Sequence, residues 1–268
     1  MNIPTNLRKT VLDPGVLFSL ANIFAFRQSH SVTVLFIALV TFAAAVRFAW
    51  LAACGGKISQ NTWFTPMRAN GCGVLAASVF SFTAGAVLPG IAGLGFTVFS
   101  FLVASKRMNH LQNDPKASGW LKAALHPAIY CGIGYAMIGL MAGGGFRLLD
   151  DPLANVPALV MTCLGVGVTI LSTIGLVSGS FQNPAAPFMA VALGTFINAL
   201  AGIASGNILG TINNLLAMAG EIRVAWDAQD LFEAHDHGYV PVGWLAALSE
   251  LLLWPLYILQ DALTKPRL

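Results

Sequence analysis

Long apolar stretches separated by short polar connectors run through almost the whole chain. Most are close to the roughly 20 residues that an α-helix needs to cross the hydrocarbon core of a bilayer. A further apolar segment, residues 242–263, is predicted either to span the membrane or to lie along its surface. The main predicted helices are residues 14–26, 31–54, 70–88, 90–105, 125–142, 154–177, 187–205 and 208–226.

The composition places these segments in a membrane. Hydrophobic residues make up 56% of the chain and charged residues only 9%, and the mean hydropathy is +0.73. Soluble domains carry about 25% charged residues, so this chain has too few charges to cover a water-exposed surface. We therefore expect an all-α fold, a polytopic helical bundle of eight or nine spans. It would form a single membrane domain over residues 1–268, with the lipid bilayer around it.

Basic residues in the connectors predict the orientation. Cytoplasmic loops of membrane proteins are enriched in Lys and Arg, and a cytoplasmic N-terminus gives this distribution. The net charge of +3 is then explained by topology, and no nucleic-acid partner is predicted. Residues 1–13 are polar, so we expect no cleavable signal. The inside connectors would contain Arg8, Lys9, Lys57, Arg68, Lys106, Arg107, Lys116 and Lys122, and the outside connectors only Arg27 and Arg147.

Residues 187–226 are predicted to form a hairpin of two helices. Gly202, Gly206 and Gly210 follow one another at intervals of four residues, and small residues at this spacing let two helix backbones approach closely. We interpret these glycines as helix-packing positions, with Gly206-Asn207 at the outer turn of the hairpin. The alternative is a seam between the helices that slides during transport.

A second stretch, residues 70–109, has a similar design and predicts an internal duplication. It is broken by Pro89-Gly90, and an offset of 117 residues pairs Gly85 with Gly202. Gly85 and Gly93 are accordingly predicted as packing positions as well. Each repeat contains four predicted helices, so both repeats would have the same orientation in the membrane. The pseudo-repeats cover about residues 14–107 and 125–226.

Polar side chains inside the predicted spans are the candidates for function. Asn198, Asn213 and Asn214 need hydrogen-bond partners in hydrocarbon. They either bond between helices or line the path of a polar substrate. Arg47 either extends to the membrane surface, pairs with Glu250 or Glu221, or joins that path. Glu221 itself is expected at the inner end of its helix, in a structural role.

Enzyme chemistry is not predicted. The chain lacks the nucleophile-elbow, zinc-protease, P-loop and dinucleotide-binding motifs. Its four cysteines occur singly, without a metal-binding pair. The acidic stretch 227–237 contains His235 and His237, and a solvated loop is favoured there over a weak metal site. We predict no cofactor and no metal.

One hairpin resembles a known group of membrane proteins. Residues 193–218 combine a short glycine-containing turn with the pattern Gly210-x-x-x-Asn214 on the second helix. This segment resembles the hairpin of the YgjV-type bacterial inner-membrane proteins, distant relatives of the PQ-loop and SWEET transporters. The chain departs from the PQ-loop pattern because it has no Pro-Gln dipeptide and because its predicted repeat has four helices instead of three. The resemblance implies a helical bundle in a bacterial inner membrane, with a carrier function.

Two functions fit these observations. The first is a carrier or permease for a small polar solute, with a path lined by Asn198, Asn213, Asn214 and Arg47. The second is a non-catalytic accessory or structural subunit of a larger membrane assembly. Its support is the short connectors and the glycine-rich faces, which suit contact with partner helices or with a second copy of the chain.

Overall fold

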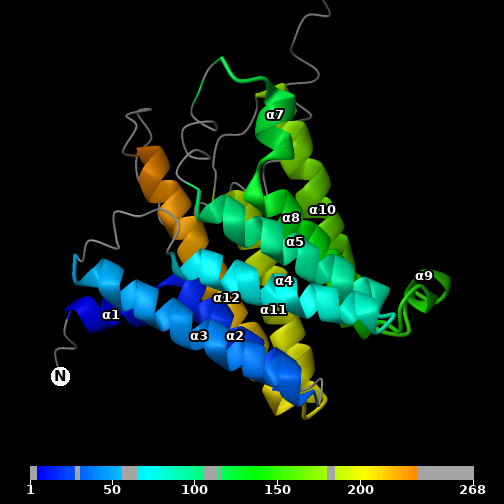
Figure 1. Cartoon of the computed structure of the whole chain (residues 1–268). Helices are drawn as coiled ribbons and strands as arrows, with labels where there is room; N and C mark the ends of the chain where they lie inside the picture. Colours follow the sequence, from blue (N-terminus) through cyan, green and yellow to red (C-terminus); the bar gives the residue numbers. More distant parts are fainter. Residues whose placement is uncertain are drawn as a thin grey trace, which may run out of the picture.

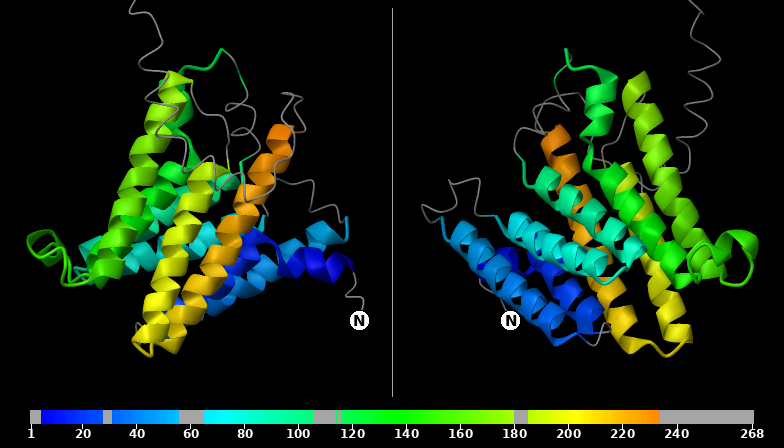
Figure 2. Two further views of the ribbon diagram at one scale, coloured as in Figure 1. Left: turned by 180° about the vertical axis from the view of Figure 1, so that it is seen from behind. Right: turned by 45° about the vertical axis from the view of Figure 1, so that its right-hand side comes forward.

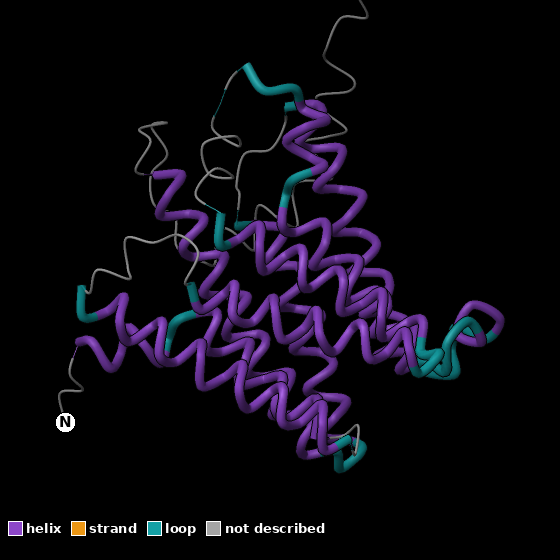
Figure 3. Tube along the Cα trace, viewed as in Figure 1, coloured by secondary structure: helices purple, strands orange, loops and turns teal. Residues whose placement is uncertain are grey.

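The computed structural model describes residues 5–27, 31–55, 65–105, 114, 116–179 and 185–233, and most of them are helical (Figures 1 and 3). No strand occurs within these ranges. The all-α prediction is therefore confirmed for the described part of the chain. The predicted segment 242–263 and the histidines of the acidic stretch 227–237 lie outside the described residues.

Each of the main apolar segments predicted from the sequence contains one long helix. Most ends agree with the prediction within a few residues, but α12 continues past its expected end at Trp226. Three short helices lie in or beside the connectors: α1 (Thr5–Val11), α7 (Gly119–Ala124) and α9 (Arg147–Asp150). The long helices are α2 (Pro14–Arg27), α3 (Val32–Ala53), α4 (Pro66–Thr83), α5 (Val87–Val103), α8 (Pro127–Ala142), α10 (Val156–Ser178), α11 (Ala186–Ala204) and α12 (Ile208–Glu233).

Several of these helices suit a membrane. Among the described residues, three helices, α3, α10 and α11, are long and apolar enough to cross one. Shorter apolar helices are α5, α8 and the part of α2 from Pro14 to Ala25. Large apolar side chains also cover the outside of the bundle, and Phe36, Val40 and Ile170 are each more than half exposed. An apolar surface of this kind marks contact with lipid or with other protein, and it supports a membrane protein.

The turn between α4 and α5 is formed by Gly85, and not by Pro89-Gly90 as the sequence suggested. Gly85 has a φ of +74°, a left-handed conformation that glycine adopts without steric cost. The Ala86 N–H donates to the Ser81 carbonyl (2.8 Å), which closes the end of α4. Pro89 lies in the first turn of α5, where a helix requires no N–H donor.

The turn between α11 and α12 has the same geometry. Gly206 has a φ of +71°, and the Asn207 N–H donates to the Gly202 carbonyl (2.9 Å). The two turns therefore correspond at an offset of 121 residues instead of 117. This register matches Gly85 with Gly206 and not with Gly202.

The long helices form two sets that lie side by side (Figure 2). In the first set α2 contacts α3 and α4, α3 packs on α4, and α4 packs on α5. In the second set α8 contacts α10 and α11, α10 packs on α11, and α11 packs on α12. The most extensive contacts between the sets are those of α5 with α8 and of α12 with α2. The main buried apolar cluster takes side chains from both sets, including Phe18, Phe99, Tyr135, Phe188 and Val224.

Glycines bring α8 and α10 into backbone contact. A Cβ atom at Gly132 would lie 2.6 Å from the Gly165 carbonyl oxygen, and one at Gly165 would lie 2.5 Å from the Ala136 nitrogen. A larger residue at either position would push the helices apart. Close contact of this kind holds helices together where lipid offers no hydrophobic driving force.

Candidate functional site

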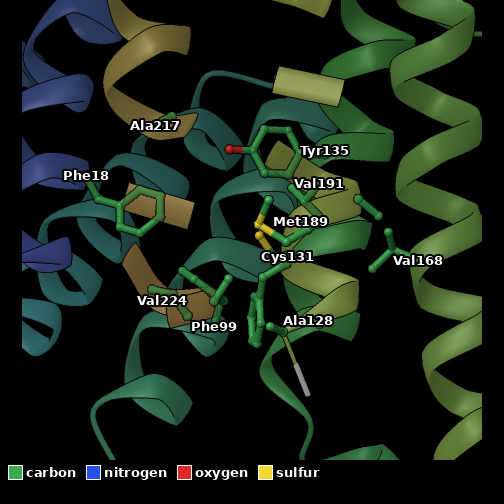
Figure 4. Close-up of a cluster of buried hydrophobic side chains, with 14 of the residues drawn as sticks. Phe18, Phe99, Ala128, Cys131, Tyr135, Val168, Met189, Val191, Ala217 and Val224 are labelled. Carbon is green, nitrogen blue, oxygen red and sulfur yellow. The ribbon is translucent and has the colours of Figure 1, made fainter. Parts of the chain in front are cut away.

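Aromatic rings connect the helices in the interior of the bundle. Phe99 of α5 lies edge-on to Phe18 of α2, with ring centroids 5.6 Å apart, and tilted to Phe188 of α11 at 6.3 Å. Phe96, also on α5, meets Tyr135 of α8 edge-on at 5.0 Å. Figure 4 shows the Tyr135 ring among the apolar side chains of this cluster, with its hydroxyl oxygen as the polar end. The apolar side chains thus hold the Tyr135 ring in place, and its hydroxyl group is left to bond to a polar partner.

A carboxyl group is buried beside these rings. Glu221 of α12 has 0% of its surface exposed. The Tyr135 hydroxyl donates to Glu221 Oε1. The Thr195 hydroxyl of α11 lies 2.9 Å from Oε2 and 3.2 Å from Oε1. One carboxyl group therefore links α8, α11 and α12. Within the described residues, the ion pair joins Arg223 and Asp227, and Glu221 forms none.

The three linked side chains lie near the middle of their helices. Thr195 is about 14 Å from either end of α11, and Tyr135 is about 12 Å from the start of α8, at 1.5 Å per residue. Glu221 is about 20 Å from the start of α12 by the same measure. In helices that cross a hydrocarbon core of about 30 Å, this places the carboxyl group at depth.

Thr195 can reach two acceptors. Its Oγ1 lies 3.0 Å from the Val191 carbonyl oxygen and 2.9 Å from Glu221 Oε2. A hydroxyl has one hydrogen, so it donates to one of these oxygens at a time. If Glu221 is ionised, Thr195 donates to the carboxylate. If Glu221 carries a proton, the carboxyl group can donate to Thr195, which then donates to Val191. The site thus has two hydrogen-bonded states that differ by one proton.

Charged side chains gather where α2 begins and α12 continues beyond Glu221. Arg223 and Asp227 form an exposed ion pair of 2.7 Å, a pairing that their i,i+4 spacing favours. Asp13 accepts a hydrogen bond from the Gly15 N–H (2.8 Å) at the start of α2. Burial raises the pKa of Asp13 to about 6, and the nearby Asp227 adds to this effect, whereas the backbone N–H donors and Arg223 oppose it.

Asn198 and Asn214, two of the predicted path residues, bond to each other across the α11–α12 hairpin. Asn198 Nδ2 donates to Asn214 Oδ1 (2.9 Å), and Asn214 Nδ2 donates to the Gly210 carbonyl (2.7 Å). Asn213 is partly buried on the same helix. An interhelical bond of this kind is worth about 0.6 kcal/mol in a membrane protein. The pair therefore has a structural role, and its part in a substrate path stays a prediction.

Arg47 does not join the asparagines. Its side chain is exposed on α3, which packs on α1, α2 and α4. The asparagine pair lies between α11 and α12. An arginine on the outside of an apolar helix can extend its charged end to the membrane surface, which is the structural alternative predicted for it.

Two predicted packing glycines lie where helices meet. A Cβ atom on Gly202 would lie 2.6 Å from Thr211 Oγ1 across the α11–α12 hairpin. A Cβ atom on Gly93 would overlap the Ser78 hydroxyl across the α4–α5 hairpin. Both positions therefore need glycine for close helix packing.

The other three predicted packing glycines have local roles. Gly85 and Gly206 occupy the two turns with positive φ. Gly210 lies in the first turn of α12, where its N–H donates to Asn207 Oδ1 (2.9 Å). A Cβ on Gly210 would meet the same Asn207 side chain at 2.8 Å. The regular spacing of four residues thus continues across a turn and does not define one packing face.

Glu221 does not lie at the end of its helix, as predicted from the sequence, and its partners Tyr135 and Thr195 were not among the predicted site residues. The error has a simple origin, because the hydrophobic run ends near Trp226 while the helix continues to Glu233. Residues 221–233 contain no glycine or proline to stop the helix. That absence was the signal that could have placed Glu221 in the middle of α12.

A second polar cluster joins α2, α4 and α5. Asn70 Oδ1 accepts hydrogen bonds from Asn22 Nδ2 (2.8 Å) and from the Ser19 hydroxyl (3.2 Å). Asn70 Nδ2 donates to the Ser100 hydroxyl (3.1 Å). Ser19 and Ser100 are fully buried, and Asn70 is nearly so. The cluster is uncharged, and both the oxygen and the nitrogen of the Asn70 amide form hydrogen bonds.

Comparison with known proteins gives no assignment: no family model, no curated protein and no solved structure matches the chain. Within the described residues, no group of three or more His, Cys, Asp or Glu side chains is placed to hold a metal ion. The chemistry that the Glu221 site offers is the exchange of a proton or a single cation at a carboxyl group.

Proposed function

We propose that the protein is a small membrane carrier for a polar solute, and that it exchanges a proton or a monovalent cation at Glu221 during transport. The observation that carries this proposal is the burial of Glu221 between Tyr135 and Thr195 near the middle of three helices. Ionisable side chains inside a membrane are rare and usually mark a pathway for ions or protons.

Energetics argue against a purely structural carboxyl group at this place. An unpaired carboxylate in an apolar interior is costly, and hydroxyl donors compensate only part of the cost. A glutamine of the same size would bond to Tyr135 and Thr195 without that cost. A glutamate at this position is therefore expected only if the protein uses the change in its charge.

The two hydrogen-bonded states of Thr195 suggest how the change of charge acts on the helices. An ionised Glu221 accepts from both hydroxyls and draws α8 and α11 toward α12. A protonated Glu221 has one donor of its own and releases Thr195 to the Val191 carbonyl, 3.0 Å away. Loss of a proton thus exchanges a bond within α11 for a bond between helices. Small changes of this kind bias packed helices between two arrangements.

The proposal is tested by Glu221→Gln, which preserves shape and hydrogen bonding but cannot ionise. Purified protein in liposomes on a solid-supported membrane would be exposed to amino acids, sugars, nucleosides and organic cations, under proton or sodium gradients. We expect a solute-dependent charge movement with the native protein and a loss of at least about tenfold with Glu221→Gln, as for groups that carry the coupling charge. The proton and sodium gradients distinguish the two ions.

Asp227→Asn is the matched control, since Asp227 lies on the same helix in an exposed ion pair. It should retain the charge movement. If no solute in the panel gives a signal with the native protein, and the protein purifies with other membrane chains, the carrier proposal is contradicted. The alternative of an accessory subunit would then hold.

A further inference from the structure

The helices of the two sets correspond one to one. The short helices α1 and α7 pack on α3 and α10, respectively. They are followed by α2 and α8, which both begin with proline. The next helices, α3 and α10, are 22 and 23 residues long, and the sets end with the hairpins α4–α5 and α11–α12. The additional helix α9 lies in the connector between α8 and α10.

The correspondence extends to the ends of the helices. The Gly15 N–H donates to Asp13 Oδ1 (2.8 Å) at the start of α2, and the Ala128 N–H donates to His126 Nδ1 (3.3 Å) at the start of α8. Both bonds skip one residue, and they are related by an offset of 113. The hairpin turns correspond at an offset of 121, where Gly85 and Gly206 both have positive φ. Helices α5 and α12 then begin at the same offset.

The contacts between the two sets are reciprocal: the last helix of each set packs on the first long helix of the other. The last helix of the first set, α5, packs on α8, the first long helix of the second set. The last helix of the second set, α12, packs on α2, the first long helix of the first set. Such an exchange is what a pseudo-twofold arrangement of two copies produces, as in an isologous dimer.

The same two offsets relate the two polar clusters. Adding 121 to Ser100 of α5 gives Glu221 of α12, and adding 113 to Asn22 of α2 gives Tyr135 of α8. The third helix contributes Asn70 in the first set, and the second set contributes Thr195, one turn further along α11 than the corresponding residue. Each cluster therefore links the first, third and fourth long helices of its set.

We infer that the chain is a tandem duplication and that the Asn70 cluster is the counterpart of the Glu221 site, with Ser100 at the position of the carboxyl group. The inference goes beyond the proposed function and does not depend on transport. It assigns a latent acid site to the first half: Asn70 Nδ2, which now donates to the Ser100 hydroxyl (3.1 Å), would donate to a carboxyl group at position 100, while Asn22 and Ser19 hold the Asn70 amide in place. The polar site of the first half is thus occupied by uncharged side chains, and it would tolerate an acidic side chain at position 100.

The test moves the carboxyl group from one half to the other in the full chain. Ser100→Glu is made alone and together with Glu221→Ser, and Ser172→Glu is the control. Ser172 of α10 is also a fully buried serine, and its hydroxyl has no hydrogen-bond partner within the described residues. The yield of monodisperse protein in mild detergent measures folding. Labelling with a hydrophobic carbodiimide, which reacts with protonated carboxyl groups in apolar surroundings, locates the acid by peptide mass spectrometry.

We expect Ser100→Glu to keep the folded yield within about threefold of the native protein and Ser172→Glu to lower it at least about tenfold, because only the first has a donor for the acid. In the double variant the carbodiimide label should move from the peptide containing position 221 to the one containing position 100. Equal loss of yield for Ser100→Glu and Ser172→Glu would overturn the inference. So would a folded double variant with no label at position 100.

Discussion

At the scale of single residues, three groups of polar side chains inside this bundle bond from one helix to another. The Asn198–Asn214 pair, the Asn70 cluster and the Glu221 site each join two or three helices by side-chain bonds. In the first two, amides and hydroxyls match donor to acceptor, which fixes the register of the helices at modest energy. The Glu221 site differs because its pattern of donors changes with one proton.

Asp13 offers a residue-scale prediction outside the membrane-spanning helices. Burial raises its pKa to about 6 from 3.8, so the folded protein binds a proton at Asp13 more tightly than the unfolded chain does. Its contribution to stability is therefore complete below about pH 4 and is lost as the pH rises to about 6. Asp13→Asn should remove this part of the pH dependence.

The measurement is the thermal unfolding of both proteins in detergent from pH 4 to pH 7. The native melting temperature should fall across this window relative to that of Asp13→Asn. Arg223 and Asp227 face Asp13, so Asp227→Asn serves as a control that alters the surroundings but keeps the titrating group. Parallel curves for the native protein and Asp13→Asn would contradict the assignment.

At the scale of elements, glycines decide how closely two helices approach. Gly165→Ala should destabilise the protein by about 1–3 kcal/mol, because the new Cβ would meet backbone atoms of α8. Gly167→Ala, two residues further on α10, is the matched control: a Cβ there meets no atom within 4 Å. This control should be neutral or stabilising by up to about 1 kcal/mol, since alanine favours a helix. Urea titration in detergent compares the two, and equal effects would exclude the packing role.

The helices themselves were predictable because long apolar runs set their number and position. The turn between α4 and α5 was not, because proline and glycine at positions 89 and 90 gave a stronger local signal than Gly85. Proline in the first turn of a helix costs nothing, and only the backbone of Gly85, at φ +74°, shows where the chain reverses. Placing this turn at Pro89-Gly90 gives an offset of 117, four residues short of the 121 that separates Gly85 from Gly206, and at 117 Ser100 aligns with Ala217 and not with Glu221.

The site was less predictable than the fold, and Tyr135 illustrates the reason. A tyrosine within an apolar run looks like a core residue, and its ring does pack on Phe96. Only the three-dimensional approach of α8 to α12 gives its hydroxyl a carboxyl partner. Asn198 and Asn214 were easier to pair, because they lie on the two arms of one hairpin.

At the scale of the whole molecule, we predict that eight helices cross the membrane and that the turns at Gly85 and Gly206 lie on its non-cytoplasmic side. In a background without Cys54, Cys72, Cys131 and Cys163, single cysteines would replace Ala84, Ser205 or Ser118. A membrane-impermeant thiol reagent added to intact cells should label the first two positions and not Ser118→Cys, which should react only after the cells are opened. Labelling of all three from outside would refute this topology.

The exchanged contacts α5–α8 and α12–α2 have a consequence for the history of the chain. A polypeptide with only one half would leave both of these helix faces without a partner, and pairing with a second copy would cover them. The two polar sites of such a homodimer would be encoded by one gene, so every substitution would change both together. If the chain arose by the inferred duplication, joining the copies would have ended that constraint. One site could then have acquired a carboxyl group while the other kept neutral amides and hydroxyls, so that the membrane would accommodate one buried acid instead of two.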